Sequence, residues 1–220
     1  MREIVPSPDT MRSLEEAARR YHLDLMESDE GLDYLTGQRG LTLDTLRYFN
    51  LGIVSDPMPE HHQFRGKLCV PYWTVSGIVS LRFKTIPDAN GNMGGPKMLS
   101  MEGAFGLARP YNVTDVLSTD QRLILTEGEP DTWTMKQLGY RVVGIQNATA
   151  WKPEYGPMFQ YRRELLIIVH GDENGAGQKL ATRISKDVPY LKQIVMPTGH
   201  DANSYFTQYG EDSLRFLLGD

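Results

Sequence analysis

Two acidic clusters in this sequence stand directly behind apolar segments. The first is residues 127–131 (Glu-Gly-Glu-Pro-Asp), after residues 123–125, and the second is residues 172–177 (Asp-Glu-Asn-Gly-Ala-Gly), after residues 165–169. Clustered carboxylates repel one another, so keeping them all charged is costly. A hard divalent cation such as Mg²⁺ removes that cost, because it takes oxygen ligands and keeps several waters for phosphate groups. The clusters therefore favour Mg²⁺-assisted phosphoryl or nucleotidyl transfer.

The segments around the clusters are typical of an α/β fold. Both apolar segments read as parallel strands that are buried on both faces. The pattern predicts strands at 123–126, 141–145, 165–169 and 193–196, and helices at 130–138, 153–161, 178–185 and 204–218. Residues just past the carboxyl ends of parallel strands line the ligand crevice of such a sheet, so both clusters are expected at one edge.

The N-terminal half has a different pattern. Apolar spacing predicts helices at 10–27, from Ser28 through Leu35, and from the capping residue Thr42 through Phe49. Strands are expected at 67–72 and 78–84, joined by a turn at 74–77. The predicted organisation is a mixed α+β N-terminal subdomain over residues 1–118, followed over residues 119–220 by a parallel sheet with flanking helices and a C-terminal helix.

Charge is distributed unevenly along the 220 residues. The chain has a net charge of −5, but residues 61–109 hold six Lys and Arg against two Asp and Glu. This middle segment is the only basic one, so polyphosphate ligands are expected there. No apolar stretch is long enough to span a membrane, and the N-terminus lacks a signal-peptide pattern. The lone Cys69 excludes an intrachain disulfide framework and a Cys-based zinc ribbon, so a cytoplasmic protein is expected.

The acidic motifs resemble the TOPRIM domain, which bacterial-type DNA primases, topoisomerases and some nucleases share. Its pattern is a strand followed by Glu-Gly, then a strand followed by Asp-x-Asp-x-x-Gly. Asp172 matches the first Asp, but Asn174 replaces the second, which removes one anionic ligand and leaves a neutral oxygen donor. Residues 197–203 (Pro-x-Gly-x-Asp-x-Asn) resemble the final acidic motif of primases and contain Asp201 and Asn203.

The likeness to primases extends over nearly the whole chain. Residues 34–41 (Tyr-Leu-x-x-x-Arg-Gly-Leu) and 49–52 (Phe-x-Leu-Gly) resemble the opening of the primase catalytic core, and residues 64–97 resemble its basic subdomain. In that family the basic subdomain faces the TOPRIM carboxylates across a shallow cleft. The resemblance implies that nucleotide phosphates and template DNA are bound by Arg65, Lys67, Arg82, Lys84 and Lys97.

The resemblance implies a phage- or plasmid-like DNA primase core, with no zinc ribbon and no helicase-binding domain. Such a core would synthesise short RNA primers on single-stranded DNA from ribonucleoside triphosphates, using Mg²⁺ or Mn²⁺ and no zinc. The implied catalytic residues are Glu127 and Asp172. The implied metal ligands are Glu127, Asp131, Asp172, Asn174, Asp201 and Asn203. A replicative helicase, or a separate chain with the zinc ribbon, would be a partner, and the location would be the host cytoplasm if a phage encodes the chain.

Two other functions stay open at this point. One is a TOPRIM nuclease. The other is a catalytically weakened accessory protein of the replisome, because Asn174 and Asn203 replace carboxylates and the zinc ribbon is missing. Among the remaining residues, His170 is expected to be structural or hydrogen-bonded, His200 is a candidate for a secondary role beside Asp201, and Trp73 is expected to pack or to stack on a base.

Overall fold

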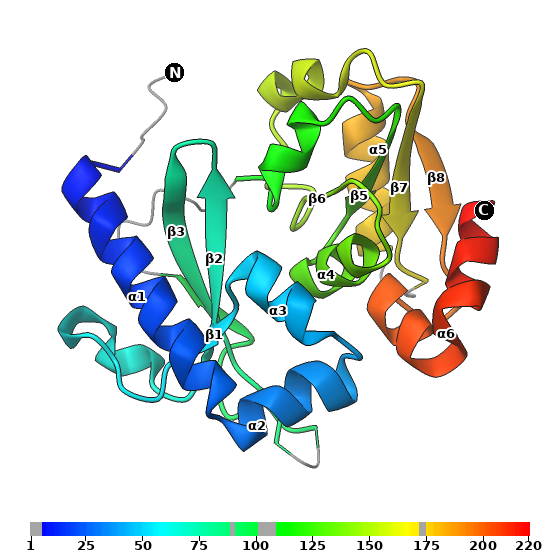
Figure 1. The fold of residues 1–220 in the computed structure, drawn as a ribbon. Coiled ribbons are helices and arrows are strands. Elements are labelled where there is room, and N and C mark those ends of the chain that lie inside the picture. The colour runs from blue at the N-terminus through cyan, green and yellow to red at the C-terminus, as the bar shows by residue number, and fades with distance from the viewer. Residues whose placement is uncertain (1–5, 89–90, 101–108, 172–174) are drawn as a thin grey trace. The chain divides into compact units, whose positions relative to one another are not determined.

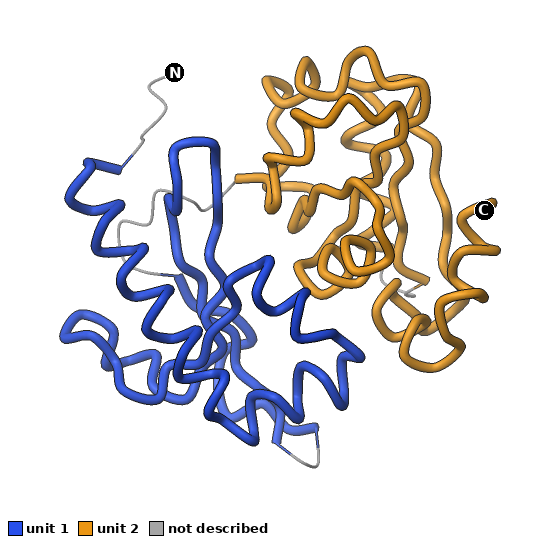
Figure 2. The backbone as a smooth tube through the Cα atoms, in the orientation of Figure 1, with its two compact units in different colours: residues 1–107 blue, residues 108–220 orange. Residues whose placement is uncertain are grey.

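The computed structural model describes residues 6–88, 91–100, 109–171 and 175–220 (Figure 1). The chain forms two compact units, residues 1–107 and 108–220 (Figure 2). The sequence placed this boundary after residue 118. The segment after residue 108 belongs to the second unit because Tyr111 forms a β-bridge with Gly144, and the Asn112 side chain donates a hydrogen bond of 2.8 Å to the Val142 carbonyl.

The first unit packs helices on an antiparallel sheet. Its helices are α1 (Pro8–Met26), α2 (Asp29–Leu32), the π-helical turn η1 (Asp33–Gln38), α3 (Leu43–Phe49) and the 3₁₀ turn η2 (Pro59–Phe64). The strands β1 (Gly52–Ile53), β2 (Leu68–Thr74), β3 (Gly77–Lys84) and β4 (Met98–Ser100) pair in the order β1-β2-β3-β4. The predicted helix cap Thr42 accepts a hydrogen bond from the backbone of Thr45.

The core of the first unit lies between α1 and one face of this sheet. Four buried residues of α1 recur at helical spacing and pack against alternate residues of β2 and β3. The cluster contains Leu14, Ala17, Ala18, Tyr21, Cys69, Leu81 and Phe83. Burial raises the pKa of the Cys69 thiol, as expected for a structural rather than a reactive cysteine.

The second unit is a four-stranded parallel sheet, as the sequence predicted. The strands β5 (Arg122–Thr126), β6 (Val142–Gly144), β7 (Glu164–Val169) and β8 (Lys192–Val195) have the order β6-β5-β7-β8. The helices are α4 (Glu129–Gln137), α5 (Ala176–Ser185) and α6 (Ala202–Leu218), with 3₁₀ turns η3 (Val113–Leu117) and η4 (Pro153–Phe159). The helix predicted at 153–161 is the 3₁₀ turn η4, which has Pro157 inside it, where an α-helix would need a backbone donor.

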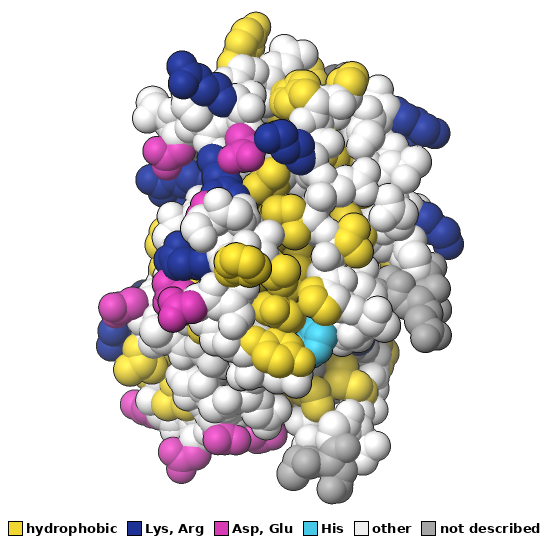
Figure 3. Space-filling view, turned by 90° about the vertical axis from the view of Figure 1, so that its right-hand side faces the viewer, with side chains coloured by type: hydrophobic (Ala, Val, Ile, Leu, Met, Phe, Trp, Pro, Cys, Tyr) yellow, Lys and Arg dark blue, Asp and Glu magenta, His cyan; other side chains and the backbone are white. Residues whose placement is uncertain are grey.

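Both faces of the parallel sheet are covered. Leu125 and Ile167 pack with α5 on one face, whereas Ile124 and Ile168 pack with α4 and α6 on the other. The interiors of the two central strands, residues 123–125 of β5 and 165–168 of β7, are therefore apolar. At the β8 edge the cover is less complete: Val195, Tyr209 and Phe216 are exposed, and hydrophobic side chains form a band on the face that looks onto β8 and α6 (Figure 3). None of the described helices is long and apolar enough to cross a membrane.

Candidate active site

Three neighbouring strands of the second unit end at one edge of the sheet and deliver polar residues there. β5 ends at Thr126 and is followed by Glu127, while β7 ends at Val169 and is followed by His170. The two strands are parallel and directly paired, so these two side chains emerge beside each other. β8 pairs with β7 on its other side, and the segment after β8 leads to Asp201 at the start of α6.

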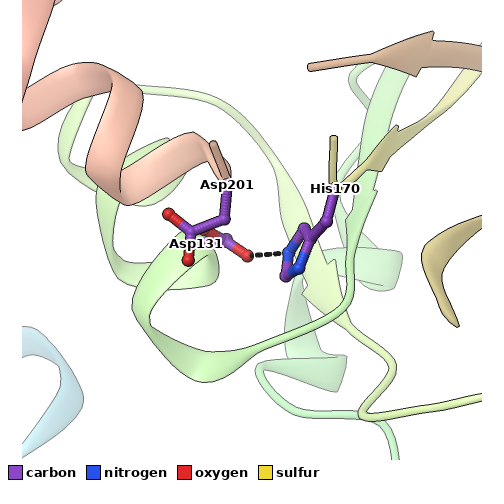
Figure 4. A group of neighbouring side chains, drawn as sticks. All are labelled: Asp131, His170 and Asp201. Carbon is purple, nitrogen blue, oxygen red and sulfur yellow. Dashed lines mark hydrogen bonds and ion pairs between the residues drawn. The ribbon is translucent and has the colours of Figure 1, made fainter. Parts of the chain in front are cut away.

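The central group of the site is Asp131, His170 and Asp201, whose ligand atoms lie within 4.8 Å of one another (Figure 4). His170 Nε2 is 2.7 Å from Asp131 Oδ2, and His170 Nδ1 is 3.6 Å from Glu127 Oε2. The imidazole thus lies between the acid after β5 and the acid in α4. The sequence predicted a hydrogen-bonded His170 but gave no indication of its partners, because residues 39 positions apart make the contact.

Asp131 is held rigidly at the base of the site. Its side chain is only 2% exposed, and its second oxygen, Oδ1, accepts a hydrogen bond of 3.0 Å from the backbone N–H of Asn203. The buried side chain of Asn203 donates to Thr134 Oγ1 in α4 at 2.9 Å. Asn203, a predicted metal ligand, therefore joins α6 to α4 through its side-chain nitrogen and positions Asp131 through its backbone nitrogen.

Asp201 serves the fold as well as the site. Its carboxylate accepts a hydrogen bond of 2.7 Å from the backbone of Ser204, as the N-cap of α6. Next to it, the rings of His200, Tyr205 and Tyr209 contact one another, with centroids 4.7–5.6 Å apart. This aromatic cluster was not predicted from the sequence, although the four-residue spacing of Tyr205 and Tyr209 places both rings on one face of a helix.

Gly171 fixes the loop that carries Asp201. Its N–H donates to the His200 carbonyl at 3.0 Å, and its carbonyl accepts from the Gly199 N–H at 2.8 Å. A Cβ at this position would lie 2.2 Å from the Pro197 carbonyl oxygen. The residue therefore has to be glycine for the loop after β8 to approach the end of β7 so closely.

The other acids that the sequence singled out differ in how exposed they are. Glu127 has a side chain that is 15% exposed at the edge of the sheet, and Glu129 is buried in the first turn of α4. Asp172, Glu173 and Asn174 lie outside the described residues. The structure thus brings together Glu127, Asp131 and Asp201 of the predicted set, with His170 among them.

The acids around His170 set its protonation. Burial alone would lower its pKa, but the hydrogen bond that its Nε2–H donates to Asp131 and the negative charges of Asp131, Glu127 and Asp201 raise the pKa of His170 to about 9. In the metal-free protein the protonated imidazole therefore acts as the internal counterion of the carboxylates.

This shift predicts how stability depends on pH. Because the folded-state pKa exceeds the ordinary value of 6.5, the contribution of His170 is complete below about pH 6.5 and is lost as the pH rises through about 9. A shift of this size corresponds to about 3 kcal/mol of folding free energy.

The measurement is urea unfolding in EDTA at pH 6 and pH 9.5 for wild type and His170→Gln. The pH-dependent loss should be about 3 kcal/mol smaller in the variant, and the exposed His62→Gln is the matched control. Equal losses in all three proteins would contradict this assignment.

The predicted phosphate-binding cations of the first unit differ in exposure. Arg65 and Lys97 are exposed, and Lys67 donates to Thr85 Oγ1 at 2.8 Å. Arg82 and Lys84 are buried, contrary to a simple surface role, and Arg82 lies 5.0 Å from the centroid of the Tyr72 ring. Both project from the face of β3 opposite the α1 core, because they alternate with Leu81 and Phe83 along the strand.

Comparison with known proteins places this arrangement in context. No family model matches the chain. The "Gene 57 protein" of Mycobacterium phage D29 is 32% identical over 156 residues, which are 69% of this chain and 97% of that protein.

Two solved structures show the fold. The RNA polymerase domain of Mycobacterium tuberculosis primase DnaG matches with a TM-score of 0.76 and 19% identity, over 97% of this chain and 84% of that one. A DnaG primase catalytic domain bound to ssDNA matches with a TM-score of 0.71 and 16% identity, over 95% of this chain and 80% of that one. The chain therefore belongs to the family of the gene 57 protein of Mycobacterium phage D29 and has the fold of the DnaG primase catalytic core.

Proposed function

We propose that this chain is a DNA primase core that synthesises short RNA primers on single-stranded DNA. The observation that carries the proposal is the meeting of Glu127, Asp131 and Asp201 at the carboxyl edge of the parallel sheet, in a chain with the primase core fold. The DnaG domain of similar fold that was solved with ssDNA supports the choice of template.

The donor set fits a hard divalent cation. Two carboxylates lie within 4.8 Å of each other, and Glu127 is next to the same imidazole. Oxygen ligands of this kind suit Mg²⁺ or Mn²⁺, whereas His170 is already hydrogen-bonded to Asp131 and is better placed to orient that acid. We assign Glu127, Asp131 and Asp201 as ligands, together with Asp172 and Asn174, and we assign Asn203 to positioning. When bound, the metal would lower the pKa of the attacking 3′-hydroxyl and stabilise the pyrophosphate leaving group.

The remaining roles in the reaction are proton transfer and the binding of phosphate groups. Glu127, at 15% exposure, is reachable from solvent and is the candidate to accept a proton at the reacting hydroxyl. In the first unit, Arg65, Lys67, Arg82, Lys84 and Lys97 supply the positive charge for triphosphate and template. A helicase, or a separate chain with a zinc ribbon, would direct the core to its start sites.

The deciding experiment is incubation of the chain with single-stranded DNA, labelled ribonucleoside triphosphates and Mg²⁺ or Mn²⁺. New short oligoribonucleotides are the expected result. Shortened DNA would instead identify a nuclease, and DNA binding with neither product would identify an accessory protein.

The exposed cations of the first unit give a second test. Arg65→Ala with Lys97→Ala should weaken binding to single-stranded DNA and leave the fold intact, because both side chains are exposed. If each contacts one phosphate, the slope of log affinity against log salt should fall by about 1.4. Fluorescence anisotropy of a labelled oligonucleotide at several salt concentrations measures both quantities. Lys186→Ala with Lys192→Ala removes the same charge from exposed positions of the second unit and is the control. An unchanged slope in the first double variant would place the DNA path elsewhere.

A further inference from the structure

A groove of about 540 Å³ lies within the first unit, and its lining includes none of the predicted phosphate-binding cations. Helix α1, the end of α3 and the β2–β3 hairpin form its walls. Its lining residues are Glu15, Arg19, Arg47, Tyr48, Asn50, Trp73 and Ile78. This volume is within the range of about 300–1,000 Å³ that is usual for sites that bind small molecules.

Trp73 and Tyr48 form the aromatic part of the groove. Trp73 is half-buried, and its indole Nε1 is buried without a hydrogen-bond partner in the described part of the chain. The β2–β3 register shifts between Tyr72 and Trp73, which is the kind of irregularity that re-aims a side chain. Tyr48 adds a second ring, 51% exposed, at the rim.

The charged residues at the rim suit a ligand that carries both an anionic group and hydrogen-bond donors. Arg19 and Arg47 are both exposed; Arg47 pairs with the exposed Asp44 at 2.9 Å, and the Arg19 side chain makes no hydrogen bond or ion pair within the described residues. Glu15 lies at the hairpin, where its carboxylate would be 2.6 Å from a Cβ on Gly77. Two cations, two exposed or half-exposed rings and one carboxylate match a nucleotide unit, which has phosphate, a stacking face and amino groups.

We propose that this groove binds single-stranded nucleic acid, with a base stacked on Trp73 and the flanking phosphates at Arg19 and Arg47. Stacking on an aromatic ring together with cations along the backbone is the usual way in which proteins hold a single strand without reading its sequence. The open rim suits a strand that passes through. Binding in this groove requires neither the acidic site nor catalysis. A test of the groove is therefore independent of whether the chain synthesises primers.

Tryptophan fluorescence can test the groove directly. The other two tryptophans, Trp133 and Trp151, are only 1% and 3% exposed, so quenching by a stacked base reports on Trp73. Titration with a dT₁₂ oligonucleotide, without metal or triphosphates, should give saturable quenching that disappears in Trp73→Phe. Mononucleotide dTMP should bind far more weakly than the strand. Equal affinity for dTMP would overturn the assignment to a strand.

A second measurement compares the affinity of labelled dT₁₂ for the wild type with its affinity for variants of the groove. Trp73→Leu should weaken binding about tenfold, since stacking contributes about 1–3 kcal/mol per base. Arg19→Ala with Arg47→Ala should weaken binding and lower the salt slope, and Lys186→Ala with Lys192→Ala is the control. Glu15→Gln should bind about two- to fivefold more tightly, because an exposed carboxylate near phosphates is removed. Unchanged affinity in both the Trp73→Leu protein and the double arginine variant would overturn the proposal. Glu15→Gln keeps the test decisive if Trp73→Leu fails to fold.

Discussion

Replacing Glu127 with Gln should lower the rate of primer synthesis at least about a hundredfold, which is the usual cost of losing a carboxylate with an acid–base or metal-binding role. The substitution keeps the size of the side chain and removes its charge. Glu127 lies 3.6 Å from His170 and follows directly on β5, which places its carboxylate at the edge of the sheet.

The assay for this prediction is the yield of labelled oligoribonucleotides on single-stranded DNA at saturating Mg²⁺. Glu154→Gln is the matched control, because Glu154 is an exposed acid of the same unit and its replacement should leave the rate unchanged. Circular dichroism would show that both variants are folded. Should Glu127→Gln retain more than half of the wild-type rate while remaining folded, Glu127 would be neither the proton acceptor nor a required ligand.

Much of the second unit could be predicted from sequence because its signals are local. The apolar segments at β5 and β7 and the acids that follow them specify a buried parallel sheet with a polar carboxyl edge, and the structure confirms that sheet. The exception in secondary structure was residues 153–159. A helix was predicted there, but Gly156 and Pro157 disfavour an α-helix and the segment forms a 3₁₀ turn.

The contacts inside the site could not be predicted in the same way. Which acid His170 contacts depends on how β5, β7 and the first turn of α4 come together, and no local pattern records that geometry. Asn203 illustrates the same limit: its position in the motif indicated a metal ligand but not that its amide nitrogen bonds to Thr134. Similarly, the sequence indicated Arg82 as a phosphate-binding cation but not that alternation along β3 and the contact with Tyr72 bury its side chain.

Replacing Gly171 with Ala should destabilise the second unit by about 3 kcal/mol, because overpacking against atoms that cannot yield costs this much or more. The added Cβ would lie 2.2 Å from the Pro197 carbonyl oxygen and 2.5 Å from that of Met196. Both are backbone atoms, so relief requires the loop after β8 to move away from β7. That movement would break the hydrogen bonds of Gly171 with Gly199 and His200.

Unfolding of this unit can be followed separately from the rest of the chain. In a Trp73→Phe background the remaining tryptophans, Trp133 and Trp151, are both buried in the second unit, so their emission in urea reports on it alone. Gly156→Ala, in the same unit, is the control, since a Cβ there would meet its nearest atom at 3.5 Å, an ordinary van der Waals contact, and its effect should be within about 1 kcal/mol. Because Asp201 follows the same loop, Gly171→Ala should also weaken Mg²⁺ binding in the fraction that stays folded. A Gly171→Ala protein as stable as the control would mean that the loop carrying Asp201 is not held against β7, and the geometry proposed for the metal site would lose its support.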